Sequence, residues 1–108
     1  MATRKKLSNR RKKQISKDCW DMDYAFYNWM LEHLKVYLKD ASPVVDLTYN
    51  KEEYNGVEYT QEEAVKRMIK LCENLTNDRT SYIFSEDCQR DAEELIDLWK
   101  IWHRAMWW

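Results

Sequence analysis

Glycine, proline and cysteine are scarce in this chain of 108 residues, which contains one Gly, one Pro and three Cys. Because tight turns depend on Gly and Pro, their scarcity argues against a many-stranded β fold and favours a few long helices. Cys19, Cys72 and Cys88 are far apart and lack CxxC spacing, so neither a disulfide framework nor a zinc knuckle is predicted. A reducing compartment fits this usage best.

The chain also lacks a long apolar run and a recognisable catalytic motif. No apolar stretch is long enough for a membrane span, and none follows the basic N-terminus as a secretory signal requires. His33 and His103 have no Cys or carboxylate at metal-ligand spacing, and no nucleophile context surrounds them. We therefore expect an unexported, non-enzymatic protein with no catalytic residues, no metal site, no cofactor and no membrane partner.

Acids and aromatics are missing from the first seventeen residues, which hold eight of the eighteen Lys and Arg. Residues 18–108 hold the other ten bases and all nineteen acids. The formal charge is therefore +8 for residues 1–17 and −9 for residues 18–108, which gives a total of −1. All fifteen aromatic residues lie at or after Trp20. This composition predicts a basic arm over residues 1–17 that does not fold by itself, joined to one acidic domain over residues 18–108.

The basic arm carries enough positive charge to neutralise several phosphates and release their counterions. We expect it to contact nucleic acid regardless of base sequence, because no aromatic interrupts the arm to stack on bases. The alternatives are a solubilising tail, a nuclear-import signal in a eukaryotic host, and an arm that folds back on the acidic domain. The candidate nucleic-acid-binding residues are Arg4, Lys5, Lys6, Arg10, Arg11, Lys12, Lys13 and Lys17.

Apolar periodicity in the acidic domain predicts three helices, and so a mainly α fold. The first spans residues 21–40 and is apolar around most of its circumference. We therefore expect it to be the central helix, covered on two sides by the rest of the body or by a partner. The second begins at the capping box Thr60-Gln61-Glu62-Glu63, and pairs of Glu62 with Lys66 and Glu63 with Arg67 are expected on its outer face. The third begins after Ser85, which follows a loop over residues 76–84.

A β-leaning stretch separates the first two helices. It surrounds Asn55-Gly56, the dipeptide that most readily supplies the two positive φ angles of a tight hairpin turn. The predicted fold is therefore a three-helix domain with a small β-hairpin between its first and second helices, preceded by the basic arm. The hairpin is expected to rest on the helices, and its β-leaning residues are Val44, Val45, Leu47, Tyr49, Tyr54, Val57 and Tyr59.

Two carboxylates, Asp23 and Asp91, interrupt the apolar positions of the first and third helices. Paired inward acids bind divalent metals in some helical enzymes, but the repeated ExxE and ExxD spacing of all-α nucleotide pyrophosphatases is absent. Only Glu94 and Asp97 have an ExxD spacing, and both are expected to point outward. Helix capping or dipole complementation is the preferred interpretation, and a small all-α metal-dependent nucleotide hydrolase is the alternative function.

The C-terminus is rich in tryptophan. Trp99, Trp102 and Met106 continue the inner stripe of the third helix, whereas Trp107 and Trp108 leave it. The last two residues either fold over the end of the core or anchor a partner, which includes a second copy of the chain. The acidic surface either meets a basic groove on a host protein or is simply solvated. The candidate partner-binding residues are Trp29, Trp107 and Trp108.

Several short motifs occur together in residues 19–108. They are Trp20-Asp21-Met22-Asp23-Tyr24, Glu32-His33-Leu34-Lys35, Val45-Asp46-Leu47-Thr48, Tyr54-Asn55-Gly56-Val57-Glu58-Tyr59-Thr60-Gln61 and Met106-Trp107-Trp108. In this combination the chain resembles a group of small uncharacterised proteins encoded by bacteriophages of Gram-positive hosts. The resemblance implies a viral protein in the cytoplasm of a bacterial host, and it carries over no catalytic residues.

The sequence as a whole therefore favours a non-enzymatic phage protein that docks on a host protein or protein–nucleic-acid complex. A host nuclease with a defence role is one such target, and inhibition of it is one expected outcome. The basic arm would contact nucleic acid in the same complex. A minor virion component that touches packaged DNA is a further alternative.

Overall fold

The computed structural model describes residues 6–77, 82 and 85–107. These residues are mainly helical and include one antiparallel hairpin, which confirms the predicted fold class. None of the described helices combines the length and the apolar character needed to cross a bilayer. In chain order the elements are α1 (Asn9–Asp18), the 3-10 turn η1 (Cys19–Asp21), α2 (Met22–Ala41), β1 (Lys51–Tyr54), β2 (Val57–Thr60), α3 (Gln61–Leu75), α5 (Glu86–Trp102) and the 3-10 turn η2 (His103–Ala105).

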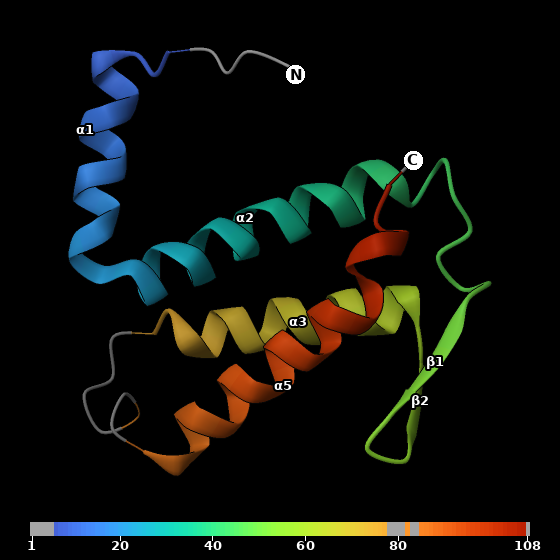
Figure 1. Ribbon diagram of the computed structural model, residues 1–108. Coiled ribbons are helices and arrows are strands. Elements are labelled where there is room, and N and C mark those ends of the chain that lie inside the picture. Colours follow the sequence, from blue (N-terminus) through green and yellow to red (C-terminus); the bar gives the residue numbers. More distant parts are fainter. Residues whose placement is uncertain (1–5, 78–81, 83–84, 108) are drawn as a thin grey trace.

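Helix α3 lies at the centre of the body and packs against both α2 and α5 (Figure 1). Seven of its fifteen residues are buried, against four of the twenty residues of α2. The expectation that residues 21–40 form the central helix is therefore wrong. One flank of α2 meets α3, and α5 packs on α3 instead of covering the other flank.

The uncovered flank of α2 leaves apolar side chains in contact with water. Met22, Trp29 and Val36 are 68%, 49% and 55% exposed. A cover on both sides was expected from the rest of the body or from a partner, and the described part of the body supplies it on one side. Among the described elements, α3 makes the extensive contact with α2, because the body has too few elements to enclose a helix that is apolar around most of its circumference.

The hairpin forms at Asn55-Gly56, whose φ angles of 49° and 78° are both positive as a type I′ turn requires. The Tyr54 hydroxyl donates to Asp97 Oδ2 at 2.9 Å, and this bond fastens the hairpin to α5. Asp97 thus faces the body, contrary to the sequence interpretation.

Residues 44–49 form turns. Their β-leaning composition had suggested an extension of the hairpin strands, which does not form here. Asp46 Oδ1 accepts from the Thr48 amide at 3.0 Å and from the Thr48 hydroxyl at 2.6 Å, which bends the chain. These bonds lower the pKa of the exposed Asp46 carboxyl, the side-chain bond first and the backbone bond second. The turn places Leu47 in the core, where it is 3% exposed.

The predicted helix starts are confirmed. Thr60 Oγ1 accepts from the Glu63 amide at 3.2 Å, and Glu63 Oε1 accepts from the Thr60 amide at 3.0 Å, which completes the capping box of α3. Ser85 Oγ accepts from the Cys88 amide at 3.2 Å and caps α5. The predicted loop over residues 76–84 is described only in part, because residues 78–81 and 83–84 lie outside the described residues.

The capping box also explains which acid pairs with Arg67. Glu63 is held by the Thr60 amide, so the predicted pair with Arg67 does not form, whereas Glu62 and Lys66 pair at 3.0 Å as expected. Arg67 instead donates from Nε and Nη2 to the two carboxylate oxygens of Glu94, at 2.6 and 2.9 Å. Glu94 therefore does not point freely outward, and this bidentate pair joins α3 to α5.

A buried glutamine connects three elements where α3 begins. Gln61 is 3% exposed, and its amide nitrogen donates to the Tyr37 hydroxyl at 2.9 Å and to the Ala105 carbonyl at 3.1 Å. These bonds tie α3 to α2 and to η2, so they close the end of the body that carries the C-terminus (Figure 1). Sequence reasoning missed this role, because a polar residue in the first turn of a helix is ordinarily solvated.

Candidate nucleic-acid interface

The basic arm forms a helix, whereas its composition suggested that it would not fold. Ser8 caps α1 by accepting from the Arg11 amide at 3.1 Å. Arg, Lys and Gln dominate the helix, and these residues have high intrinsic helix propensity. Helix α1 ends at Asp18, and the 3-10 turn η1 follows it, with Asp21 at φ −151° directly before α2.

Helix α1 projects from the N-terminal end of α2, away from α3 and α5 (Figure 1). None of its residues is buried. The radius of gyration is 16.0 Å, compared with about 13 Å for a compact domain of this size, as a projecting helix requires. Helix α1 therefore contributes no buried residue to the core of the body.

The described bases of the arm are accessible to a ligand. Lys6, Arg10, Arg11, Lys12, Lys13 and Lys17 are all exposed, whereas Arg4 and Lys5 lie outside the described residues. The salt bridges of the described chain lie within the body, and none of them involves α1. Within residues 9–18, α1 therefore does not fold back on the acidic body through a salt bridge.

Three of these bases share one face of α1. At about 100° per residue, Arg10, Lys13 and Lys17 fall within an arc of about 60°. The one acid of the helix, Asp18, lies outside this arc and accepts from Gln14 Nε2 at 2.9 Å. The face thus presents positive charge without an intervening carboxylate.

An apolar groove lies between α2 and the C-terminal part of the chain, with a volume of about 520 Å³. Trp29 is half exposed here, and its ring stacks on His33 with the ring centroids 4.1 Å apart. His33 Nδ1 lies 2.7 Å from the Trp29 carbonyl oxygen, which fixes the imidazole against the indole. The groove is lined by Trp29, Met30, Glu32, His33, Leu34, Val36, Tyr37, Trp99 and Met106.

The three predicted partner-binding tryptophans do not form one cluster in the described residues. Trp29 lines the groove, Trp107 is 70% exposed but is not part of the lining, and Trp108 lies outside the described residues. Trp102 is 2% exposed and belongs to the core, as its position on the inner stripe predicted. Of the candidate tryptophans, Trp29 is therefore the one that the structure places in a concave surface.

The carboxylates of Asp23 and Asp91 have separate structural roles. Asp23 lies in the first turn of α2, and its pKa is lowered by a side-chain hydrogen bond with Asp21 and then by the Tyr24 amide. Asp91 accepts from the Tyr82 hydroxyl and from Asn74 Nδ2, the latter at 3.5 Å.

A second cavity, of about 220 Å³, includes Asp23 in its lining but not Asp91. Within the described ranges, no group of three or more His, Cys, Asp or Glu side chains is arranged to hold a metal ion. The geometry of these residues gives no support to metal-dependent hydrolysis.

Comparison of the chain with protein-family models, with curated proteins and with solved structures found no significant match.

Proposed function

We propose that this is a non-enzymatic interaction protein that contacts nucleic acid through α1 and docks on a host protein through the groove beside α2. The observation that carries the proposal is α1 itself. Its bases are exposed, its acid-free face is formed by Arg10, Lys13 and Lys17, and none of its residues is buried. The resemblance of the motifs to bacteriophage proteins favours the cytoplasm of a bacterial host as the place of action.

Nucleic acid is the partner that best suits the charged face of α1. A polyanion surrounded by condensed counterions gains entropy when bases displace those ions, and this gain does not depend on base sequence. An ordered helix also positions its bases before binding, so less conformational entropy is lost than with an unfolded tail.

The first prediction concerns salt-dependent binding to a random-sequence DNA duplex. In the variant Lys13→Gln/Lys17→Gln, affinity should fall about 50-fold near 0.1 M salt, because two phosphate contacts are lost. The slope of log affinity against log salt should become shallower by about 2. Fluorescence anisotropy of a labelled duplex, titrated at several salt concentrations, measures both quantities.

The matched control is Lys39→Gln/Lys70→Gln, which removes the same charge from exposed lysines of the body. This variant should bind with nearly the affinity of the unmodified protein. An equal loss in both double variants would show that net charge alone governs binding, and it would overturn the assignment of α1.

The groove fits a host-protein segment that combines apolar and basic side chains. Its lining is apolar apart from a few polar groups, and Glu32 supplies a negative charge at its edge. The body that surrounds it holds ten bases and nineteen acids over residues 18–108, so a basic partner meets a complementary field. Proteins that bind nucleic acid carry strongly basic surfaces, and a host nuclease is one such target.

The second prediction tests this docking. Tagged protein should retain one defined host protein from nuclease-treated bacterial lysate, and Trp29→Asp should abolish this retention because a carboxylate is placed in the apolar groove. The control is Tyr49→Asp, which places the same carboxylate at an exposed aromatic side chain outside the groove and should leave retention unchanged. Equal retention by Trp29→Asp would remove the groove from the proposal, since the captured protein would then bind elsewhere.

A further inference from the structure

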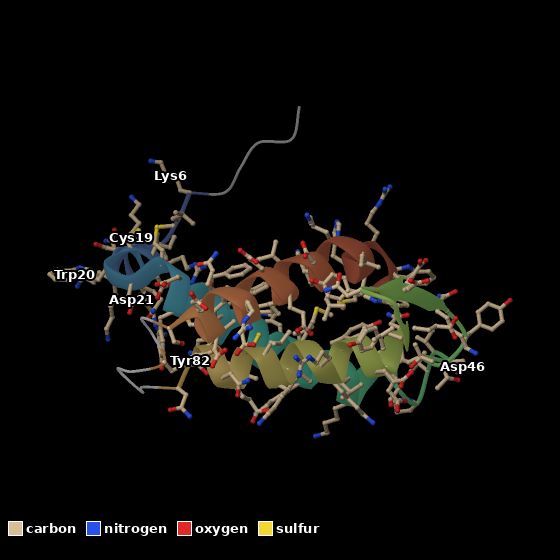
Figure 2. The ribbon with its side chains drawn as sticks, turned by 90° about the horizontal axis from the view of Figure 1, so that it is seen from below. Lys6, Cys19, Trp20, Asp21, Asp46 and Tyr82 are labelled. Carbon is tan, nitrogen blue, oxygen red and sulfur yellow. The ribbon has the colours of Figure 1, made fainter. Side chains whose placement is uncertain are left out.

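Trp20 is the most exposed large apolar side chain among the described residues. It lies in η1, directly after the basic helix α1, and is 91% exposed. Figure 2 shows its indole at the end of the molecule, pointing away from the body. The fold thus leaves a large aromatic ring in water without using it for packing.

A right-handed helical backbone leads from α1 directly into the 3-10 turn η1. Asp18 has φ −63° and ψ −32°, and Cys19 has φ −66° and ψ −16°, both in the right-handed helical region. Counted at about 100° per residue as far as Asp18 and about 120° per residue in the 3-10 turn, Trp20 projects about 20° from Lys13, 20° from Lys17 and 40° from Arg10. The indole therefore extends the basic face of α1, whereas Asp18 lies about 120° away from it.

We propose that this face binds single-stranded nucleic acid, with Arg10, Lys13 and Lys17 on the phosphates and Trp20 stacked on an unpaired base. The proposal rests on the nucleic-acid contact proposed above and adds the class of ligand. A basic surface beside an exposed aromatic ring is the arrangement by which proteins hold single strands without reading their sequence. The rise from Arg10 to Trp20 is about 15 Å, which suits a short site of about four nucleotides.

A single strand fits Trp20 better than a duplex does. The bases of a duplex are already paired and stacked, so an indole reaches their faces only by unstacking a step, at a cost of a few kcal/mol. An unpaired base offers its face without that cost, and stacking removes apolar surface of both rings from water. Phosphate contacts alone do not favour a single strand through the faces of its bases. A higher affinity for the single strand than for the duplex therefore identifies the contribution of Trp20.

The test compares a labelled oligothymidylate with a hairpin duplex that has the same number of phosphates. Trp20→Ala should lower affinity for the single strand about 5- to 150-fold and leave duplex affinity within about twofold. Trp20→Tyr should keep most of the single-strand affinity, because a second aromatic ring restores stacking. The control is Trp107→Ala, another exposed tryptophan, which should change neither affinity. An oligouridylate in the same assay distinguishes RNA from DNA as the preferred strand.

The outcomes separate this inference from the function it rests on. If Lys13→Gln/Lys17→Gln weakens both ligands while Trp20→Ala weakens neither, the phosphate contact stands and stacking by Trp20 is overturned. If Trp20→Ala weakens both ligands equally, base stacking is likewise overturned, since duplex binding does not offer an open base. If the unmodified protein binds neither ligand, the proposed nucleic-acid contact fails, and this inference fails with it.

Discussion

Replacement of Trp102 by alanine is expected to lower the free energy of unfolding by about 3–5 kcal/mol. Trp102 is 2% exposed and belongs to the buried cluster that joins α2, α3 and α5, together with Leu34, Met68 and Leu98. Removing the indole loses its transfer free energy and leaves a cavity that the surrounding helices fill only in part. A loss of this size is a large share of the total stability of about 5–15 kcal/mol of a small domain.

Urea denaturation followed by circular dichroism measures this change, and the chain supplies matched controls. Trp20→Ala and Trp107→Ala remove the same side chain from positions that are 91% and 70% exposed. Each should change the free energy of unfolding by no more than about 0.5 kcal/mol. If Trp102→Ala proved as mild as the controls, Trp102 would not contribute to the core, and the docking of the C-terminal end of α5 would need revision.

The second large effect is a loss of stability at alkaline pH that originates at Cys72. This residue is fully buried in α3, and burial raises the pKa of its thiol from 9.0 to about 12. In the unfolded chain the thiol ionises near pH 9, whereas in the folded protein it stays neutral. The contribution of the neutral thiol to the free energy of unfolding is therefore intact below pH 9. It is lost as the pH rises toward 12, at up to about 1.4 kcal/mol per pH unit.

Between pH 8 and pH 10.5, the Cys72 thiol alone should lower the free energy of unfolding by about 2 kcal/mol. Tyrosines and lysines also titrate in this range, so the comparison is made between variants. Cys72→Ala should show a shallower loss than the unmodified protein by this amount, whereas Cys19→Ala, at an exposed thiol, should keep the full loss. Identical pH dependence in all three proteins would place the Cys72 thiol in contact with water.

The parts of the fold that sequence reasoning predicted depend on short-range interactions. The capping box at Thr60, the cap at Ser85 and the turn at Asn55-Gly56 each involve residues within four positions of one another. Their geometry is therefore set by neighbouring residues and does not depend on how the rest of the chain packs.

The predictions from the sequence fail where a side chain has several possible partners or environments. Glu63 and Glu94 were both within reach of Arg67. Because Glu63 is bonded to the Thr60 amide in the capping box, Arg67 pairs with Glu94. Gln61 reads as an ordinary first-turn residue, and only the approach of Tyr37 and Ala105 makes it a buried connection.

The candidate site shows the same division. The charge of the arm was evident from composition, and the absence of acids from its first seventeen residues pointed to phosphate contact. The position of Trp20 beside the arm was not predicted, because the first helix of the body was expected to begin at residue 21. Since η1 continues the right-handed helical backbone of α1, the indole lies on the side of the helix that carries Lys13 and Lys17.

The sequence by itself determined the separation of charge, the helical class, the starts of α3 and α5 and the hairpin turn, because each follows from composition or from neighbouring residues. Only the tertiary structure decided that α3 is central, that one flank of α2 stays open beside the groove, and that no residue of α1 is buried. The physical reason is that the helices have more apolar surface than a body of this size encloses. Which surface remains exposed depends on the joint packing of segments that are distant in sequence.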